Sequence, residues 1–373
     1  MDELERTIRE RIAREGPITF EAFMDMALYH PGLGYYASPR SEIGRAGDFY
    51  TSPHLHPAFG AMLGRQAEEM WRLMGRPADF KVVEAGGGRG WLARDMLDYL
   101  RGGEFFEALS YCLVEPSPHM ARRQGELLSD YEGKVRWARA LGEMSPFRGC
   151  LLSNELVDAL PVHIVEMTGD GLREVLVTLK EGGFGEVLGH PTDEGIVRYV
   201  EEFSLDLPVG YRTEINLALR GWLREAASAL AEGFVVTVDY GYPAWEYYSP
   251  ERSRGTLLCY RGHETNEEPL RDAGGQDITA HVNFTAMRKW GEELGLRPVG
   301  FARQGVFLVS LGIDEYIAGL GPEDFQFEVA RIKGLIMPGT MGESHKVLVQ
   351  YKGSGEAPAL RGFAMKNQLD SLS

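Results

Sequence analysis

The sequence predicts an α/β protein built on an open, mostly parallel β-sheet. Two observations carry this prediction. From Asp79 onward, short apolar runs alternate with segments of helical periodicity, which is the pattern of successive βαβ units. The first of these runs ends in a glycine-dense turn, Gly86–Gly90, that leads directly into a helical pattern. Such a strand–turn–helix unit places backbone N–H groups and a helix N-terminus against a ligand.

The N-terminal part is predicted to be helical. Residues 2–14 have apolar side chains at every fourth position, which predicts an amphipathic helix. Thr19 is a suitable N-cap for a second helix, Phe20–Tyr29, and Ala58–Met74 has the pattern of a long third helix. Between them, Gly44–Pro53 is a polar loop with two aromatic residues, which fits either a surface turn or a lid over a binding site.

The strands and helices of the core follow in alternation, and right-handed crossovers are the expected connections between parallel strands. The predicted strands are Phe80–Glu84, Ser110–Glu115, Val135–Ala138, Cys150–Ser153 and Phe234–Asp239, with helices at 91–100 and 118–130.

Residues 161–231 interrupt this rhythm and are predicted to be an inserted α+β segment. Its pieces are strands at 162–167 and 173–179, a glycine-rich turn at 182–185, and helical stretches near 194–202 and 213–231. The candidate final strands are Pro298–Ala302, Val306–Leu311 and Lys346–Tyr351, the last two as a hairpin. From Lys352 onward we expect a loose tail.

Composition excludes several classes of function. The 373 residues are 44% hydrophobic and carry 55 acidic against 39 basic side chains, a formal charge of −16. A general binder of phosphate backbones needs a basic face, so no nucleic-acid partner is expected. No apolar run approaches the roughly 18 residues of a membrane span. Nothing resembles a secretory or transit signal, so we expect a cytoplasmic protein.

Cysteine usage agrees with a reducing compartment. The three cysteines, Cys112, Cys150 and Cys259, are far apart, and no C-x-x-C pair occurs. This spacing supports neither a zinc site nor a disulfide framework, and each cysteine is predicted to be a buried, reduced thiol.

The glycine turn predicts a particular kind of ligand. A phosphate loop needs Lys and Ser or Thr after its last glycine, but Trp91 and Leu92 follow Gly90. A dinucleotide fingerprint is matched only weakly, with Ala85 in place of its first glycine. The pattern present is E-x-G-x-G-x-G, which resembles the first motif of methyltransferases that use S-adenosylmethionine. A glycine-rich turn without a ligand is the alternative.

Acidic side chains end or follow four of the predicted strands, at the edge where open α/β sheets bind ligands, and Glu84 ends the first of these strands. Glu115 follows the second strand, and a carboxylate there can accept both hydroxyls of a ribose. Asn154, Glu155 and Asp158 follow the fourth strand within one turn, and Asp239 follows the fifth. Helix capping explains Asn154 alone but not the two further acids.

At this point the chain resembles the MidA / NDUFAF-seven-like family of S-adenosylmethionine-dependent methyltransferases, from residue 16 to about 350. Any one motif alone is weak, whereas seven in fixed order are a strong signal. These motifs are Gly47–Pro53, Glu84–Gly90, Val114–Pro118, Ser153–Glu155 with Asp158–Pro161, Val238–Gly241, Gly255–Leu257 with Tyr260, Arg261 and His263, and Asp277–Phe284.

The resemblance implies a class I methyltransferase (Rossmann-like) fold, with a seven-stranded, mostly parallel sheet, an N-terminal helical region and the inserted segment. It divides the chain into 1–75 with a cofactor-covering loop, the first part of the core (76–160), the insertion (161–231), the rest of the core with substrate-side loops (232–351) and the tail (352–373). S-adenosylmethionine is the implied cofactor. Its implied contacts are Gly47, Asp48, Thr51, Ser52 and Pro53 in the loop, Glu84, Gly86, Gly88 and Gly90 at the methionine end, Glu115, Pro116 and Ser117 at the ribose, and Asn154 near the sulfur.

The implied methyl acceptor is an arginine of a protein, because a mitochondrial relative modifies an arginine of a respiratory-complex subunit. A guanidinium needs carboxylates to orient it, and Glu155 and Asp158 are the candidates. His281 or His263 could accept a proton. Two other readings stay open: a methyltransferase for the oxygen or nitrogen of a small molecule, and a non-catalytic S-adenosylmethionine-binding assembly factor. We also keep a homodimer as a possible assembly.

The chain departs from the family pattern at two places. His54 stands where the family commonly has Glu, and Gly86-Gly87-Gly88 replaces a Gly-Pro-Gly turn. His54 and His56 could be interpreted as metal ligands, but no carboxylate or thiol lies at matching spacing, so no metal is predicted.

Overall fold

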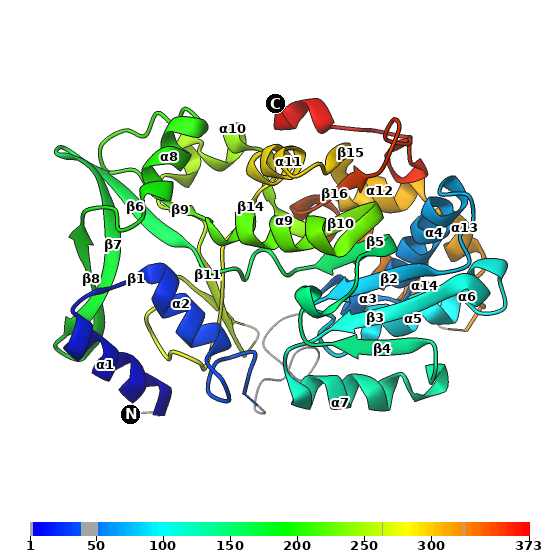
Figure 1. Cartoon of the computed structure of the whole chain (residues 1–373), viewed down its shortest axis with the longest axis horizontal. Helices are drawn as coiled ribbons and strands as arrows, with labels where there is room; N and C mark the ends of the chain where they lie inside the picture. Colours follow the sequence, from blue (N-terminus) through cyan, green and yellow to red (C-terminus); the bar gives the residue numbers. More distant parts are fainter. Residues whose placement is uncertain (1–2, 39–50, 263, 324) are drawn as a thin grey trace. The chain divides into compact units, whose positions relative to one another are not determined.

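The computed structural model describes residues 3–38, 51–262, 264–323 and 325–373. Its chain forms two compact units (Figure 1). The sheet unit comprises residues 50–156, 222–241 and 284–373, and the accessory unit comprises residues 1–49, 157–221 and 242–283. No helix within the described residues is both long and apolar enough to cross a membrane.

The sheet unit is built on a mixed β-sheet whose neighbours follow the order β15-β16-β10-β5-β2-β3-β4. Five neighbouring strands, from β10 to β4, are parallel, whereas β16 is antiparallel to both β10 and β15. The strands are β2 (Phe80–Ala85), β3 (Leu109–Val114), β4 (Val135–Ala138), β5 (Phe147–Asn154), β10 (Leu230–Tyr242), β15 (Arg297–Arg303) and β16 (His345–Lys352). The predicted mostly parallel sheet is confirmed.

The order of the strands determines where a ligand can bind. The chain proceeds outward from β2 through β3 to β4 and then returns to place β5 on the other side of β2. This reversal is a topological switch point, and open α/β sheets bind ligands beyond the carboxyl ends of the strands at such a point. The residues after β2 and β5 therefore occupy the favoured position.

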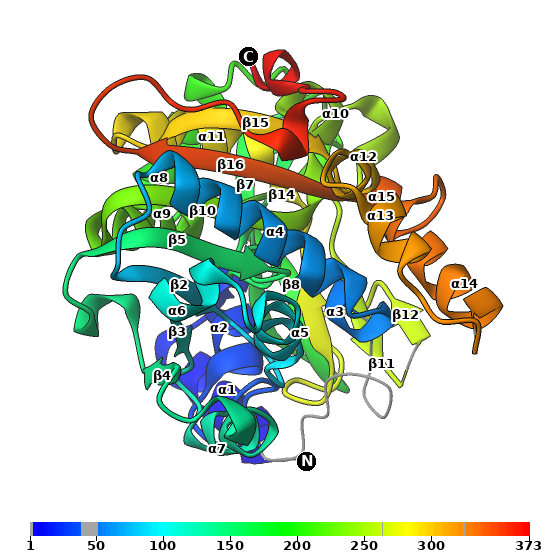
Figure 2. The ribbon, with the colours of Figure 1, turned by 90° about the vertical axis from the view of Figure 1, so that its right-hand side faces the viewer.

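Helices cover the sheet, and α4 and α5 supply much of one hydrophobic core. Phe59, Met62 and Trp71 of α4 are buried in the same cluster as Val82 of β2 and Leu97 of α5. Figure 2 shows α4 running diagonally across the strands. The helices of this unit are α3 (Ser52–Leu55), α4 (Ala58–Leu73), α5 (Trp91–Leu100), α6 (Glu104–Ala108), α7 (Pro118–Leu127), α11 (Phe284–Glu293), α12 (Gln304–Ser310), α13 (Ile313–Ala318), α14 (Phe325–Ile336) and α15 (Met341–Ser344), with α9 (Ala218–Ala229) entering it from the accessory unit.

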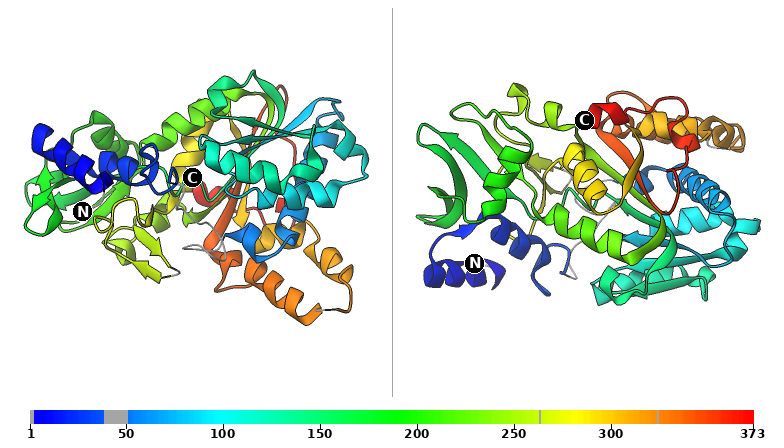
Figure 3. Two further views of the ribbon diagram at one scale, coloured as in Figure 1. Left: turned by 90° about the horizontal axis from the view of Figure 1, so that it is seen from below. Right: turned by 45° about the horizontal axis from the view of Figure 1, so that its top comes forward.

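The accessory unit contains an antiparallel sheet in the order β1-β7-β6-β9, with β8 added on β7, and a small sheet β12-β11-β13. Its core joins Leu4, Ile8 and Phe23 of the first two helices to Val175 and Val177 of β7. Figure 3 shows these helices, in dark blue, alongside the green strands. The elements are α1 (Glu3–Glu15), β1 (Ile18–Thr19), α2 (Phe20–Tyr29), β6 (His163–Thr168), β7 (Gly171–Lys180), β8 (Gly183–Gly189), α8 (Glu194–Glu202), β9 (Arg212–Ile215), α10 (Ala244–Tyr247), β11 (Leu258–Arg261), β12 (Glu264–Asn266), β13 (Asp277–Thr279) and β14 (Val282–Asn283).

Some sequence predictions are wrong. Val306–Leu311 is not a strand: residues 306–310 belong to helix α12, Leu311 is its C-cap, and β16 pairs with β15 instead. A short apolar run does not distinguish a buried strand from a buried helix, because an element that is buried on all sides has no polar face and so shows no period in its sequence. The stretch 213–231 was predicted to be helical throughout, but it begins with β9. Residues 183–185 begin strand β8.

The C-terminal segment differs from the loose tail expected of it. It contains two 3-10 helices, Arg361–Phe363 and Leu369–Leu372. The Phe363 ring packs on Phe307 with centroids 5.3 Å apart, and the Gly362 N–H donates to the Gln66 side chain at 3.2 Å. Three apolar side chains of this segment, Leu360, Phe363 and Leu372, are buried and dock it on the core.

Candidate active site

The turn after β2 adopts the backbone that its glycines allow. Gly86, Gly88 and Gly90 have φ values of +70°, +50° and +86°, a region open to glycine at little cost. Among the described atoms, a Cβ on Gly88 would meet nothing within 4 Å, whereas one on Gly86 would lie 2.7 Å from Leu156 Cδ1. Gly90 is the N-cap of α5, so the turn and the first N–H groups of α5 present donors to a ligand.

Glu84 lies against this turn and is only 3% exposed. The Tyr111 hydroxyl donates to Glu84 Oε2 at 2.6 Å. A Cβ on Gly87 would lie 3.3 Å from Oε1, which places that oxygen beside the turn. Burial raises the pKa of Glu84 to about 7, and the hydrogen bond from Tyr111 opposes this shift. A cation bound at the turn would favour the ionised carboxylate.

Glu115 follows β3 and is held by two donors. The Ser117 N–H donates to Oε1 at 2.9 Å, and the Gln124 amide donates to Oε2 at 3.2 Å. The same amide donates to the Gly88 carbonyl at 2.7 Å, and its oxygen accepts from the Trp137 indole at 2.9 Å. Burial raises the pKa of Glu115, and both donors oppose that shift. The fully buried Gln124 thus ties the glycine turn to Glu115.

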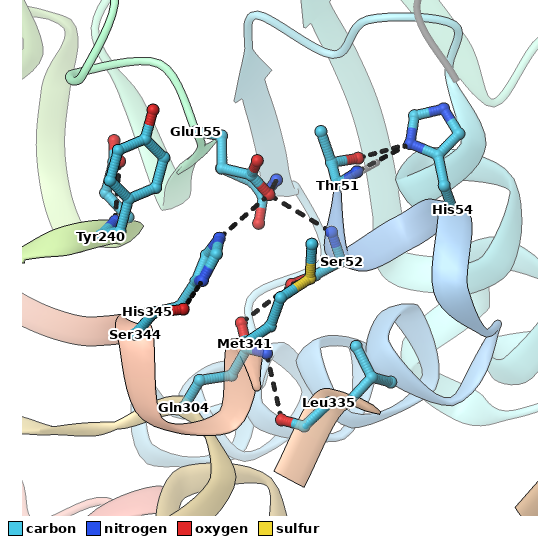
Figure 4. Close-up of polar contacts among 12 residues, drawn as sticks. Thr51, Ser52, His54, Glu155, Tyr240, Gln304, Leu335, Met341, Ser344 and His345 are labelled. Atoms are coloured by element: carbon cyan, nitrogen blue, oxygen red, sulfur yellow. Dashed lines mark hydrogen bonds and ion pairs between the residues drawn. The ribbon is translucent and has the colours of Figure 1, made fainter. Parts of the chain in front are cut away.

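Glu155 follows β5, the strand beside β2, and lies at the centre of a polar cluster (Figure 4). Its Oε1 accepts from the Ser52 N–H and from the Asn154 side chain, both at 3.2 Å. His345 Nε2 lies 3.4 Å from the same oxygen. In the part of the chain that the structure describes, no residue bonds Oε2. One carboxylate oxygen is therefore fixed, and the other can meet a ligand. We call Ser52, Asn154, Glu155 and His345 the Glu155 cluster.

The backbone at Glu155 has a conformation that is uncommon for a side-chain-bearing residue. Its φ is +49°, in the left-handed region. The Glu155 N–H donates to the Val238 carbonyl of β10 at 2.9 Å, which holds the residue in place. Such strain costs on the order of 1–3 kcal/mol and gathers at functional sites.

Thr51–Pro53, the described end of the predicted covering loop, contacts the Glu155 cluster through Ser52. Ser52 is fully buried, and its hydroxyl donates to Gln304 Oε1 at 3.0 Å. Gln304 in turn donates to the Leu335 carbonyl at 3.1 Å (Figure 4). Pro53 lies in the first turn of α3. Gly47 and Asp48, the other predicted loop residues, lie outside the described residues.

The remaining predicted site residues are Asp158, His281, His263 and Pro116. Asp158 and His281 belong to the accessory unit, where the Ala280 N–H donates to the Asp158 carbonyl at 2.9 Å and so brings the two segments together. The His281 N–H donates to Thr256 Oγ1 at 3.1 Å. His263 lies outside the described residues. Pro116 is exposed between Glu115 and Ser117.

The two histidines considered as metal ligands have separate protein partners. Thr51 Oγ1 lies 2.5 Å from His54 Nδ1, and His56 Nε2 lies 2.5 Å from a Glu328 carboxylate oxygen. Within the described residues, no group of three or more His, Cys, Asp or Glu could hold a metal ion. Cys112, Cys150 and Cys259 are buried and free, as predicted.

Sequence reasoning missed Gln124 and His345. Gln124 lies on the predicted helix after Glu115, and the signal for it was an amide at a buried helical position. His345 immediately precedes the last predicted strand. Strand pairing brings it to the cluster, because β16 lies beside β10 and pairs His345 with Tyr240. No local pattern contains that information.

The fold and the site together define a class of enzyme. A switch-point sheet of this order, a glycine turn after its first core strand and acids at the next strand ends are the arrangement of an S-adenosylmethionine-dependent methyltransferase. The chain belongs to the family described as "Putative S-adenosyl-L-methionine-dependent methyltransferase", whose model matches residues 62–302.

Individual relatives support this assignment. The chain is similar to a Burkholderia thailandensis protein of the COG1565 superfamily, solved in complex with S-adenosyl-homocysteine, with a TM-score of 0.90, 32% identity, and coverage of 99% of this chain and 96% of that one. It is 29% identical to the Drosophila melanogaster protein named "Protein arginine methyltransferase NDUFAF7 homolog, mitochondrial", over 94% of this chain and 85% of the relative. It is 28% identical to the Danio rerio protein named "Protein arginine methyltransferase NDUFAF7, mitochondrial", over 82% of this chain and 76% of the relative. S-adenosylmethionine is therefore its cofactor.

The described residues fit this cofactor. Asn154 Oδ1, His54 Nε2 and Trp91 Nε1 are buried and have no hydrogen-bond partner among them. Asn154, at the end of β5, offers an acceptor for an ammonium group. The rings of His54 in α3 and of Trp91 after the glycine turn offer N–H donors for a carboxylate, so the three match the charged groups of a methionine chain.

Proposed function

We propose that this protein transfers the methyl group of S-adenosylmethionine to a guanidinium nitrogen of arginine in a protein. The observation that carries the proposal is the Glu155 carboxylate, with Oε1 held by Ser52 and Asn154 and with Oε2 not bonded by the described residues. A guanidinium offers paired donors to such a carboxylate, which fixes its plane and orientation. The names of the Drosophila and Danio relatives support this acceptor.

The proposed cofactor contacts follow from the strand ends. Glu84 and the turn Gly86–Gly90 would hold the methionine end, Glu115 would accept from the ribose hydroxyls, and Asn154 would lie near the ammonium group. When bound, the cofactor supplies an already activated methyl group. The task of the protein is then to hold an acceptor nitrogen in line with that group, and positioning of this kind can supply roughly 7–11 kcal/mol.

The proposed roles of the residues that would hold the acceptor arginine are based on charge. Asp158 would assist Glu155 in orienting the guanidinium, and His281 would accept a proton. The net charge of −16 suits a cationic acceptor, because a negative surface attracts it. The cytoplasmic location and the homodimer stay predictions, and the Drosophila and Danio relatives are named as mitochondrial proteins.

The test is methyl transfer from S-adenosylmethionine with a tritiated methyl group into a cell lysate. We expect label in protein, recovered as methylarginine after acid hydrolysis. Label only in small molecules would assign a small-molecule acceptor instead, and no label in either fraction would favour a non-catalytic binding protein. A Glu155→Gln sample run in parallel controls for contaminating methyltransferases.

A further inference from the structure

The imidazole of His54 has a defined tautomer. The Thr51 N–H donates to His54 Nδ1 at 3.4 Å, and the Thr51 hydroxyl lies 2.5 Å from the same nitrogen (Figure 4). Because Nδ1 accepts a hydrogen bond, the proton of the neutral ring is on Nε2. Burial lowers the pKa of His54, Glu155 opposes this shift and Arg89 adds to it, so the ring is neutral at physiological pH.

The Nε2–H group of His54 is a donor without an acceptor. Nε2 is buried and unbonded among the described residues. The Trp91 indole nitrogen is in the same state, and the two rings are 6.3 Å apart between centroids. A buried donor left without a partner destabilises the folded protein. Two neighbouring donors of this kind indicate a site for an acceptor group.

The surroundings of the two rings favour an anion. Trp91 is the first residue of α5, directly after the glycine turn, where the partial positive charge of a helix N-terminus lies. Arg89 is close enough to lower the pKa of His54, which shows that a cation acts on the ring. The Arg94 guanidinium, which also bonds the Asp95 carboxylate, lies 4.3 Å from the Trp91 ring centroid.

We propose that His54 Nε2–H and Trp91 Nε1–H bind the carboxylate of the cofactor's methionine end. The proposal rests on the proposed placement of that end at the glycine turn. Asn154 Oδ1, an acceptor, has the opposite polarity and suits the ammonium group. His54 is then a cofactor-binding residue at the position where this chain departs from the resembling family's Glu, and the site recognises the amino-acid part of the cofactor as well as its nucleoside.

Calorimetric titration of the purified full-length protein tests the proposal with two ligands. One is S-adenosylhomocysteine, and the other is its decarboxylated analogue, which keeps the nucleoside, the sulfur and the amine. Charge-assisted hydrogen bonds of this strength predict that the wild type binds S-adenosylhomocysteine about 100-fold more tightly. His54→Phe and Trp91→Phe should each weaken that ligand about tenfold and leave the analogue within about twofold.

A matched control is Trp222→Phe, because its indole nitrogen is also buried without a described partner but lies on α9, which carries no site residue. It should leave both affinities unchanged. Equal binding of the two ligands by the wild type would overturn the proposal even if a variant failed to fold. Equal weakening of both ligands in His54→Phe and Trp91→Phe would overturn it as well. Failure of the wild type to bind S-adenosylhomocysteine at all would instead reject the placement of the cofactor.

Discussion

His345 Nε2 lies 3.4 Å from Glu155 Oε1, and the two side chains are 6% and 8% exposed. The contact has the distance of an ion pair but not the geometry of a hydrogen bond, since Nε2 has no hydrogen-bond partner among the described residues. Catalytic contacts are often long before a substrate is bound and shorten in the complex. The contact joins Glu155, the residue with positive φ after β5, to the first residue of β16.

Glu155→Gln should bind S-adenosylhomocysteine like the wild type and lose methyl transfer by about 100-fold or more, because the amide keeps the shape but not the charge that orients a guanidinium. Calorimetry and tritium transfer measure the two properties. Glu126→Gln, on the exposed side of α7, is the control. Normal turnover by Glu155→Gln would remove this residue from the acceptor site.

His345→Asn should lower kcat about tenfold with little change in KM for S-adenosylmethionine, because the histidine acts through Glu155 and not on the cofactor. In a Glu155→Gln background the same change should have no further effect, since partners in one contact are not additive. Steady-state kinetics of both single variants and the double variant supply the comparison. Additive losses would mean that His345 has a separate role.

Gln124→Met should raise the Kd for S-adenosylhomocysteine about tenfold, because Glu115 and the Gly88 carbonyl lose a shared donor inside the fold. The rise in Kd caused by Gln124→Met should be smaller in a Glu115→Gln background. Arg122→Met, an exposed change on the same helix, should bind normally. If Gln124→Met bound normally as well, the link between the turn and Glu115 would have no influence on the ligand.

Glu84 should make stability depend on pH. Its pKa is about 7 in the folded protein against 4.5 as the ordinary value, so between these values the folded state binds more protons than the unfolded state. The resulting stability is fully present below about pH 4.5 and is lost as pH rises through about 7, on the order of 3 kcal/mol. Urea unfolding at pH 5 and pH 8 should show this loss in the wild type and not in Glu84→Gln. If the free energy of unfolding changed equally with pH in both proteins, the pH dependence would belong to other groups.

Cofactor affinity should change in the opposite direction. If the ammonium group of the ligand meets Glu84, binding requires the ionised carboxylate, and below about pH 7 a proton must be released. The Kd for S-adenosylhomocysteine should then rise up to tenfold for each pH unit below about 7. Titrations in two buffers of different ionisation enthalpy detect the released proton. An affinity independent of pH from 5.5 to 7.5 would separate Glu84 from the ligand.

Local patterns were sufficient for much of the fold. The buried run Phe80–Val83 marked β2, and Leu4, Ile8 and Ile12 marked α1, because burial on one or both faces leaves a regular trace in the sequence. Val306–Leu311 was misassigned since a continuous apolar run carries no period. The tail was misjudged because Leu360, Phe363 and Leu372, the large apolar residues that are buried there, follow neither a helical nor a strand period.

The site was predictable in part for a similar reason. Glu84 lies at the carboxyl end of a strand, Glu115 and Glu155 each follow one, and parallel strands bring their carboxyl ends to one edge. His345 could not be predicted as a site residue because it reaches the Glu155 cluster from the start of an antiparallel strand that is far along the chain. His54 was noted as a departure from a family pattern, but only the bonds from Thr51 revealed which of its nitrogens carries the proton.

The position of β16 has a consequence for biosynthesis. It is the last strand in sequence, yet it lies between β10 and β15. Before residues 345–352 have been synthesised, β10 and β15 each have an edge with unpaired backbone groups, because the strand that pairs with both is missing. Unpaired edges of this kind invite pairing with other nascent chains. The protein should therefore depend on chaperones until almost its whole length has emerged, and a premature stop near residue 340 should yield an aggregate instead of a shortened enzyme.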